Sequence, residues 1–253
     1  MSYEALARWY DGFTRDVPYA AFADYYEALL RRDGKERVTL LDLCCGTGNL
    51  TLPLAVRGYE LIGVDASPEM LAIAAQKAEA EKDTFAVQPM FLCQEAAELD
   101  LYGTVEGAVC ALDGINYLPP RELTELFRRL HLFLEPGGAF VFDVHSVAHL
   151  WELDGGAFVD ETEDALCLWR GEFDREKNAL VYGMDIFSRA DGTLWRRESE
   201  EHIEYAHSPE TLTVQLMQCG FTDVEFYMNG PQSDMGRLFG RAVNLPQEPA
   251  PSV

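Results

Sequence analysis

The stretch Leu40-Leu41-Asp42-Leu43-Cys44-Cys45-Gly46-Thr47-Gly48-Asn49 joins an apolar run to a glycine-rich turn. A short apolar run of this kind, beginning at Val38, is typical of a buried strand, and a helix is expected to follow from about residue 50 to residue 57. Glycines in such a turn let the backbone approach a ligand where a Cβ atom would clash. The stretch therefore predicts a strand, a ligand-binding turn and a helix, in that order.

Strand and helix patterns continue to alternate from Val38 to Val144. Further strands are expected at 59–65, 85–93, 106–112 and 139–144. Ser67-Pro68-Glu69 combines an N-cap residue, a proline at the first helical position and an acidic first turn, which together mark the start of a helix. Another helix is expected after Pro119-Pro120. This alternation predicts an α/β fold with a doubly wound, mostly parallel, Rossmann-like sheet.

The pattern changes after residue 144, where strands follow one another across polar turns. These strands are expected at 165–169, 180–187 and 195–205, and they indicate an inserted antiparallel β cap. A helix from Ser208 to Cys219 and two closing strands then return to the main sheet. The expected organisation is an N-terminal helical segment at 1–37, a cofactor-binding core at 38–144, the inserted cap at 145–207, a return to the core sheet at 208–245 and a flexible tail at 246–253.

A second acidic residue, Asp65, ends the second expected strand. In an open parallel sheet, ligands bind beyond the carboxyl ends of the strands. A carboxylate there can accept hydrogen bonds from both ribose hydroxyls of an adenosine. A dinucleotide fingerprint would require a third glycine at the position of Thr51, and a P-loop would require a Gly-Lys-Ser/Thr ending that the sequence lacks. The turn therefore favours an adenosine ligand without a pyrophosphate, such as one with a methionine tail and a sulfonium.

The composition limits the partners and the compartment that we expect. The net charge is −23, and an acidic surface repels nucleic acid, which proteins bind through Lys and Arg. Candidates for a local basic patch are the arginine pairs at 31–32, 128–129 and 196–197. The six cysteines form no CxxC pair, so no metal site is expected. No apolar run reaches the roughly 20 residues of a membrane helix, and the N-terminus has no secretory pattern, so we expect a cytoplasmic protein.

Four motifs in the core resemble those of the class I S-adenosylmethionine-dependent methyltransferase superfamily. They are Asp42–Gly48, in the D-x-x-C-G-T-G form of the cofactor loop, Val64–Leu71, Gln94-Glu95-Ala96 and the late turn Leu134-Glu135-Pro136-Gly137-Gly138. Most relatives have Asp where this sequence has Glu95. The resemblance covers the whole core and implies a Rossmann-like methyltransferase sheet with S-adenosyl-L-methionine as the cofactor. It also implies that Asp65 binds the ribose and that Ala66 and Met70 lie near the adenine.

More narrowly, the N-terminal motifs Trp9-Tyr10-Asp11 and Arg15–Tyr19, together with Asp113–Leu118, resemble a subgroup of bacterial small methyltransferases that are related in layout to glycine N-methyltransferases. In that subgroup the N-terminal segment folds over the cofactor, and an antiparallel insertion caps the substrate pocket. The cofactor-binding residues that the resemblance implies are Tyr10, Arg15, Tyr19, Asp42, Cys44, Gly46, Gly48, Asp65, Ala66, Met70, Gln94, Glu95, Ala96, Leu112, Asp113 and Tyr117.

The leading functional hypothesis is a methyltransferase that transfers a methyl group to a small-molecule acceptor by in-line displacement. The enzyme then mainly positions the reactants, and a catalytic base is needed only if the acceptor arrives protonated. The candidates for such a base are His145, just after the fifth strand, and Asp113, just after the fourth. One alternative is a methyltransferase acting on RNA or protein, which predicts a basic groove beside the pocket. Another is a non-catalytic module that binds an adenosine nucleotide.

Overall fold

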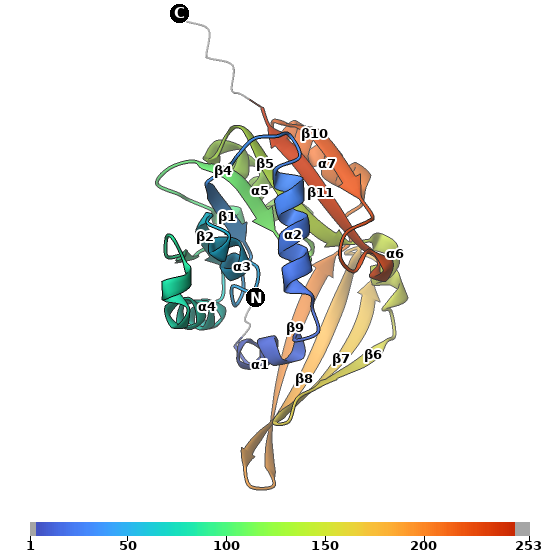
Figure 1. Ribbon diagram of the computed structural model, residues 1–253. Coiled ribbons are helices and arrows are strands. Elements are labelled where there is room, and N and C mark those ends of the chain that lie inside the picture. Colours follow the sequence, from blue (N-terminus) through green and yellow to red (C-terminus); the bar gives the residue numbers. More distant parts are fainter. Residues whose placement is uncertain (1–3, 246–253) are drawn as a thin grey trace, which may run out of the picture.

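The computed structural model describes residues 4–245, and its main feature is a seven-stranded sheet with the strand order β10-β11-β5-β4-β1-β2-β3 (Figure 1). The expected tail at 246–253 lies outside the described residues. The strands are β1 Thr39–Leu43, β2 Glu60–Asp65, β3 Met90–Cys93, β4 Val105–Cys110, β5 Leu134–His145, β10 Phe221–Tyr227 and β11 Arg237–Asn244. The first five are parallel, and β11 runs antiparallel to both β5 and β10. The prediction of a doubly wound, mostly parallel sheet is confirmed.

Helices cover both faces of this sheet and form two separate hydrophobic cores. They are α2 Tyr19–Leu30, α3 Thr51–Val56, α4 Pro68–Ala80, α5 Pro120–Phe133 and α7 Pro209–Gln218. Strand β1 shows the alternation that a sheet buried on both faces requires. Leu40 packs with α2 and α3, whereas Leu41 packs with α5 and α7 on the opposite face. Helix α2 crosses in front of the sheet in Figure 1.

Helix α4 begins where the sequence indicates. Ser67 is its N-cap, with a side-chain oxygen that accepts a hydrogen bond from the Met70 amide at 3.2 Å, and Pro68 occupies the first helical position. Strand β3 is shorter than expected, because it begins only at Met90, directly after Pro89. A proline has no N–H to contribute to a strand ladder, so the pairing starts after it.

A second sheet of four antiparallel strands, in the order β6-β7-β8-β9, extends away from the main sheet (Figure 1). Its strands are β6 Ala157–Glu161, β7 Ala165–Asp174, β8 Ala179–Asp191 and β9 Leu194–Tyr205. We call this sheet the cap. Strand β6 and the helix α6, Val147–Glu152, were not expected from the sequence. The N-terminal helix α1, Ala7–Phe13, packs on one face of the cap, where Leu6 meets Cys167, Met184 and Ile186.

The remaining elements are four short 3-10 helices, Lys82–Thr84, Ala96–Glu98, Gly114–Tyr117 and Ser233–Met235. Among residues 4–245, no helix is both long enough and apolar enough to cross a membrane.

Candidate active site

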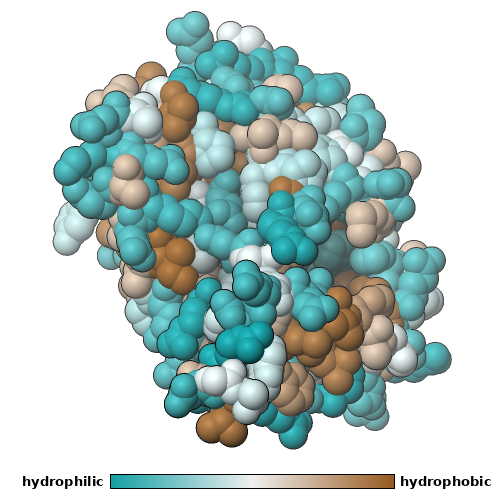
Figure 2. Space-filling model, turned by 60° about the horizontal axis from the view of Figure 1, so that its bottom comes forward, coloured by the Kyte–Doolittle hydropathy of each residue, from teal (hydrophilic) through white to brown (hydrophobic). Residues whose placement is uncertain are grey.

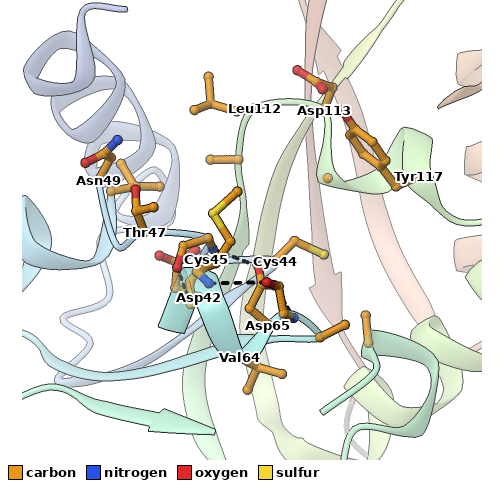
Figure 3. Close-up of a pocket in the computed structure, with 18 of the residues that line it drawn as sticks. Asp42, Cys44, Cys45, Thr47, Asn49, Val64, Asp65, Leu112, Asp113 and Tyr117 are labelled. Atoms are coloured by element: carbon orange, nitrogen blue, oxygen red, sulfur yellow. Dashed lines mark hydrogen bonds between the residues drawn. The ribbon is translucent and has the colours of Figure 1, made fainter. Parts of the chain in front are cut away.

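A cavity of about 360 Å³ opens at the carboxyl ends of β1, β2 and β4 (Figure 3). Small-molecule sites in proteins are typically about 300–1,000 Å³. Most of the residues that the sequence analysis expects at the cofactor line this one cavity. They are Tyr10, Tyr19, Asp42, Cys44, Gly46, Asp65, Ala66, Met70, Gln94, Glu95, Ala96, Leu112, Asp113 and Tyr117. The structure thus brings together the ends of three strands and the N-terminal segment.

Asp65 connects the end of β2 to the glycine turn after β1. Its Oδ2 accepts a hydrogen bond from the Gly46 amide, and its Oδ1 accepts one from the Ser67 amide, both at 2.8 Å (Figure 3). Burial raises the pKa of Asp65, and these amide hydrogen bonds oppose the rise. Each carboxylate oxygen has a further lone pair, so Asp65 can also accept hydrogen bonds from a ligand in the cavity.

Asp42 is buried below the turn. Its Oδ2 accepts a hydrogen bond from the hydroxyl of Thr51 at 2.6 Å. Burial raises the pKa of Asp42 to about 7, which the Thr51 hydrogen bond partly offsets. Thr51 stands where a dinucleotide fingerprint would place its third glycine. In this chain the position serves to orient Asp42.

The two glycines of the turn have different surroundings. Gly46 has φ +54°, and no atom lies within 4 Å of the place where its Cβ would stand, so it faces the open space of the cavity. This is the backbone cradle that a ligand held against the turn requires. Gly48 has φ +78°, and a Cβ there would stand 3.3 Å from the Cβ of Ala74. The structure therefore places Gly48 against α4 and outside the residues that line the cavity.

The N-terminal segment closes one side of the cavity through Tyr10, Thr14 and Tyr19. Asp11 ties this segment to the core. Its Oδ1 accepts hydrogen bonds from the Thr47 hydroxyl at 2.6 Å and from the side-chain amide of Asn49 at 2.9 Å. Its Oδ2 forms an ion pair with Lys77 of α4 at 2.9 Å.

Arg15, which the resemblance implies at the cofactor, does not line the cavity. Its side chain is 65% exposed and lies 4.0 Å from Asp16. Asp11 instead connects the segment to the cofactor loop. No sequence pattern predicts this contact, because its partners come from α4 and from the turn after β1.

A buried aspartate, Asp143 of β5, organises the β4 side of the cavity. It accepts hydrogen bonds from the amides of Leu112 at 2.8 Å and Asp113 at 3.0 Å, from the hydroxyl of Tyr26, and from Nη1 of Arg237. Leu112 and Asp113 are consecutive left-handed residues, with φ values of 53° and 58°. Non-glycine residues rarely adopt this conformation. The two amide hydrogen bonds to Asp143 hold the turn that presents both residues to the cavity.

The two candidate bases lie together beside Arg237 of β11. Nη2 of Arg237 donates to Asp113 Oδ1 at 2.9 Å, and His145 Nε2 lies 3.7 Å from the same oxygen. On its other side, His145 Nδ1 lies 3.0 Å from Oε2 of Glu204, a residue of the cap strand β9. Asp113 lines the cavity, whereas His145 does not.

Burial raises the pKa of Asp113 to about 6, although His145 and Arg237 oppose the rise. For His145, burial favours the neutral ring, but the carboxylates of Asp113 and Glu204 outweigh it and raise the pKa. Asp113 therefore changes protonation close to neutral pH, in the range that suits a catalytic acid or base.

Asp113, His145 and Glu204 also place potential metal-ligand atoms within 4.8 Å of one another. Arg237 Nη2, however, lies 2.9 Å from Asp113 Oδ1 and 3.0 Å from His145 Nε2. A guanidinium in contact with two of the three ligand atoms repels a metal ion. This set of side chains suits proton transfer better than metal binding.

Comparison with known proteins agrees with this geometry. A family model described as a methyltransferase domain matches residues 40–138. A protein of Geobacillus sp. (strain WCH70) that is named as a methyltransferase is 30% identical over 248 residues, which cover 94% of this chain and 98% of that protein.

Solved structures show the same fold. An S-adenosylmethionine-dependent methyltransferase from Clostridium acetobutylicum superimposes with a TM-score of 0.82 and 26% identity, over 96% of this chain and 99% of that one. The sugar N-methyltransferase KedS8 from Streptoalloteichus superimposes with a TM-score of 0.77 and 24% identity, over 94% of this chain and 93% of that one.

A Rossmann-like sheet with a glycine turn, an acidic residue at the end of β2 and these relatives together define a class of enzyme. The chain belongs to the class I S-adenosylmethionine-dependent methyltransferases. It is an enzyme that uses S-adenosylmethionine as its methyl donor, so the expected cofactor and enzyme class are confirmed.

Proposed function

We propose that this methyltransferase transfers the methyl group of S-adenosylmethionine to a small-molecule acceptor. The observation that carries the proposal is that the cofactor turn and Asp113, which has His145 beside it, meet at one cavity of about 360 Å³. A cavity of this size, which also has to hold the donor, accepts small molecules rather than a folded partner. The similarity to KedS8, which acts on a sugar nitrogen, supports the same class of acceptor.

The order of the strands suggests how the donor lies in the cavity. We place the adenine at Gln94–Ala96 beyond β3, the ribose on Asp65 at the end of β2, and the methionine part against the turn after β1. Tyr10 and Tyr19 then cover the donor from the N-terminal segment. This arrangement directs the methyl group toward β4, where Leu112, Asp113 and Tyr117 line the cavity.

The cofactor supplies a methyl group bound to a sulfonium sulfur. The acceptor attacks the methyl carbon in line with the bond to sulfur, and the sulfur leaves. The chain contributes mainly position and the exclusion of water, effects that are worth roughly 7–11 kcal/mol in well-oriented reactions. The glycine turn holds the donor, and the N-terminal segment separates it from solvent. Asp113, with His145 behind it, is placed to accept a proton from the acceptor.

We also propose that residues 145–207 form a cap over the acceptor side, as in the subgroup related in layout to glycine N-methyltransferases. The cap reaches the candidate bases through Glu204, and Asn116 beside the cavity donates to the backbone oxygen of Tyr205 at 3.0 Å. Residues 1–37 would then cover the donor, 38–144 would bind it, and 208–245 would complete the sheet. The six cysteines are all unpaired, which suits a reducing compartment such as the cytoplasm.

A nucleic-acid acceptor is less well supported. It predicts a basic groove beside the pocket, but the described residues that line the cavity include five carboxylates and a single arginine, Arg237. Of the arginine pairs considered above, Arg31, Arg32, Arg128, Arg129 and Arg197 each lie beside a carboxylate. Hydrophilic side chains cover much of the face that Figure 2 shows, with separate apolar patches. The side chains at the cavity therefore favour a small-molecule acceptor.

Replacing Asp65 with alanine should weaken S-adenosylmethionine binding about 5- to 150-fold. The change removes the acceptor for the Gly46 and Ser67 amides as well as for the ribose, and a group left without its partner costs roughly 1–3 kcal/mol. Calorimetry with S-adenosylmethionine measures the effect, and Asp83→Ala, in an exposed 3-10 helix, is the control. The proposed donor site would be refuted if wild-type protein did not bind S-adenosylmethionine, or if Asp65→Ala bound it as tightly as the wild type does.

Replacing Asp11 with asparagine should speed the dissociation of S-adenosylhomocysteine about 5- to 20-fold. The variant loses its ion pair with Lys77 and weakens the contacts to Thr47 and Asn49, so the N-terminal segment opens more readily; a charge-assisted contact of this kind is worth roughly 1–2 kcal/mol. Stopped-flow fluorescence measures the rate. Asp16→Asn, at a side chain that is 95% exposed, is the control and should leave the rate unchanged. Equal rates in the two variants would show that Asp11 does not hold the segment closed.

A further inference from the structure

The acceptor side of the cavity has a surplus of buried negative charge. Three carboxylates, Asp113, Asp143 and Glu204, share one network with the guanidinium of Arg237 and the ring of His145. Each of the four charged residues is at most 9% exposed. Arg237 balances one carboxylate, so two negative charges remain when His145 is neutral and one when it is protonated. Because buried charges require partners, this end of the cavity favours a cationic ligand.

The other titratable groups around the network do not supply the missing positive charge. Tyr26 donates its hydroxyl to Asp143, and Tyr182 lies near Glu204, where burial raises its pKa and keeps it neutral. The ring centroid of His149 lies 4.9 Å from that of His145, but burial and the neighbouring His145 lower the pKa of His149. On the cavity wall, α5 adds one more carboxylate, Glu122. Within residues 4–245, none of these neighbouring groups offsets the surplus.

The contacts of His145 fix where it can take up a proton. Arg237 Nη2 donates to Nε2 at 3.0 Å, and a guanidinium has no acceptor, so Nε2 of a neutral ring must carry the lone pair. Nδ1 then carries the hydrogen and donates it to Glu204 at 3.0 Å. Nε2 also lies 3.7 Å from Asp113 Oδ1, which is beyond hydrogen-bond distance, so His145 acts on Asp113 through its charge. Glu204 stabilises the charged form of the ring.

The charge surplus distinguishes between kinds of acceptor atom. A hydroxyl or an acidic carbon becomes an anion when it loses its proton, and nearby carboxylates oppose that change. An amine arrives as an ammonium ion, which the same carboxylates attract, and it becomes neutral when it loses its proton. The network thus favours the binding of an amine as an ammonium ion and places the carboxylate of Asp113 to take its proton, whereas it opposes the formation of an anion from the other two.

We propose that the acceptor is an amine that enters as an ammonium ion, and that Asp113 is the catalytic residue that takes its proton. This inference rests on the proposed function. One N–H bond breaks, and the proton moves to an oxygen of Asp113. The freed nitrogen lone pair forms a bond to the methyl carbon while the C–S bond breaks, and that electron pair stays on sulfur. The products are a methylated ammonium, a neutral thioether and a protonated Asp113. Arg237, His145 and Glu204 act as positioning residues for Asp113.

The test uses three ligands of the donor site and requires no knowledge of the acceptor. Sinefungin has an amine on carbon in place of the methyl-bearing sulfonium, so its ammonium stands at the position of the transferred methyl group and points toward the acceptor side. Calorimetry should show that sinefungin binds wild-type enzyme at least about 10-fold more tightly than S-adenosylhomocysteine does. In Asp113→Asn, which keeps an acceptor for Arg237, sinefungin should lose at least about 10-fold in affinity and S-adenosylhomocysteine less than about 3-fold. Asp234→Asn, an exposed carboxylate, is the matched control.

S-adenosylmethionine, the third ligand, distinguishes the two positive charges that Asp113 can bind, which are the sulfonium of the donor and the ammonium of the acceptor. An equal loss of affinity for S-adenosylmethionine and for sinefungin in Asp113→Asn would assign Asp113 to the sulfonium and overturn the inference. Equal losses for all three ligands would overturn it as well, because Asp113 would then only shape the cavity. Binding of none of the three ligands by the wild type would refute the donor site itself, so the failure of the proposed function can be recognised separately.

A pH series tests the positioning residues. The affinity for sinefungin should rise between pH 5 and pH 7 as Asp113, with a pKa of about 6, becomes ionised. Glu204→Gln should move the midpoint of this rise by at least about 0.5 pH unit while leaving the affinity for S-adenosylhomocysteine unchanged. A midpoint that stays in place would show that Glu204 and His145 have no influence on Asp113.

Discussion

Replacing Asp143 with asparagine should lower the free energy of unfolding by about 3–5 kcal/mol, the largest loss of stability that we expect from a single change near the site. Asp143 is fully buried and accepts from Tyr26, Arg237 and the amides of Leu112 and Asp113. Asparagine places a donor group among these donors and removes one of the two carboxylates that pair with Arg237. The left-handed turn at Leu112 and Asp113 also loses hydrogen bonds that hold it.

Urea denaturation measures this loss, and a fall in the melting temperature of roughly 6–20 °C should accompany it. Asp185→Asn is the control. Asp185 is also buried and has two arginine partners, but those side chains are 54% and 59% exposed and remain solvated when the carboxylate is removed. A loss in Asp185→Asn as large as that in Asp143→Asn would contradict the special importance of the network around Arg237.

Replacing Gly46 with valine should reduce the affinity for S-adenosylmethionine by more than about 100-fold. Gly46 faces the open space of the cavity, and a branched side chain there would occupy the space that the donor requires. The left-handed backbone adds a strain of roughly 1–2 kcal/mol for any residue with a Cβ.

Gly192→Val separates these two effects. Gly192 has the same φ of +54° and equally open surroundings, but it lies in the turn between β8 and β9. The two variants should lose similar stability in thermal unfolding, whereas calorimetry should detect the loss of binding only in Gly46→Val. If Gly46→Val binds S-adenosylmethionine normally, the donor does not lie against this turn.

Local patterns in the sequence were sufficient to predict the donor half of the molecule. Ser67 and Pro68 start α4 as expected, because capping depends on residues that are adjacent in the chain. Asp65 and Gly46 lie at the same cavity for a related reason: the carboxyl ends of neighbouring parallel strands meet at one edge of the sheet. The positions of these motifs along the chain were therefore sufficient to predict that they meet at one cavity.

The acceptor half depends on contacts between residues far apart in the chain, which local sequence patterns do not reveal. Arg237 is 94 residues from Asp143, and Glu204 is 59 residues from His145. No periodicity or spacing relates such pairs; only the docking of β9 and β11 brings them together. Arg15 remains a prediction from the family resemblance: in the structure its side chain is 65% exposed and does not line the cavity.

The position of β11 in the sheet has a consequence for the newly synthesised protein. It is the last strand in chain order, but it lies between β5 and β10 rather than at the edge, and Arg237 is its first residue. As a chain leaves the ribosome from its N-terminus, the strands of the donor half can assemble early. Asp143 then has no contact with the guanidinium of Arg237 until β11, the last of the described strands, joins the sheet. A nascent chain can therefore acquire a donor pocket well before its acceptor side has the guanidinium of Arg237, and the complete active site forms only when β11 joins the sheet.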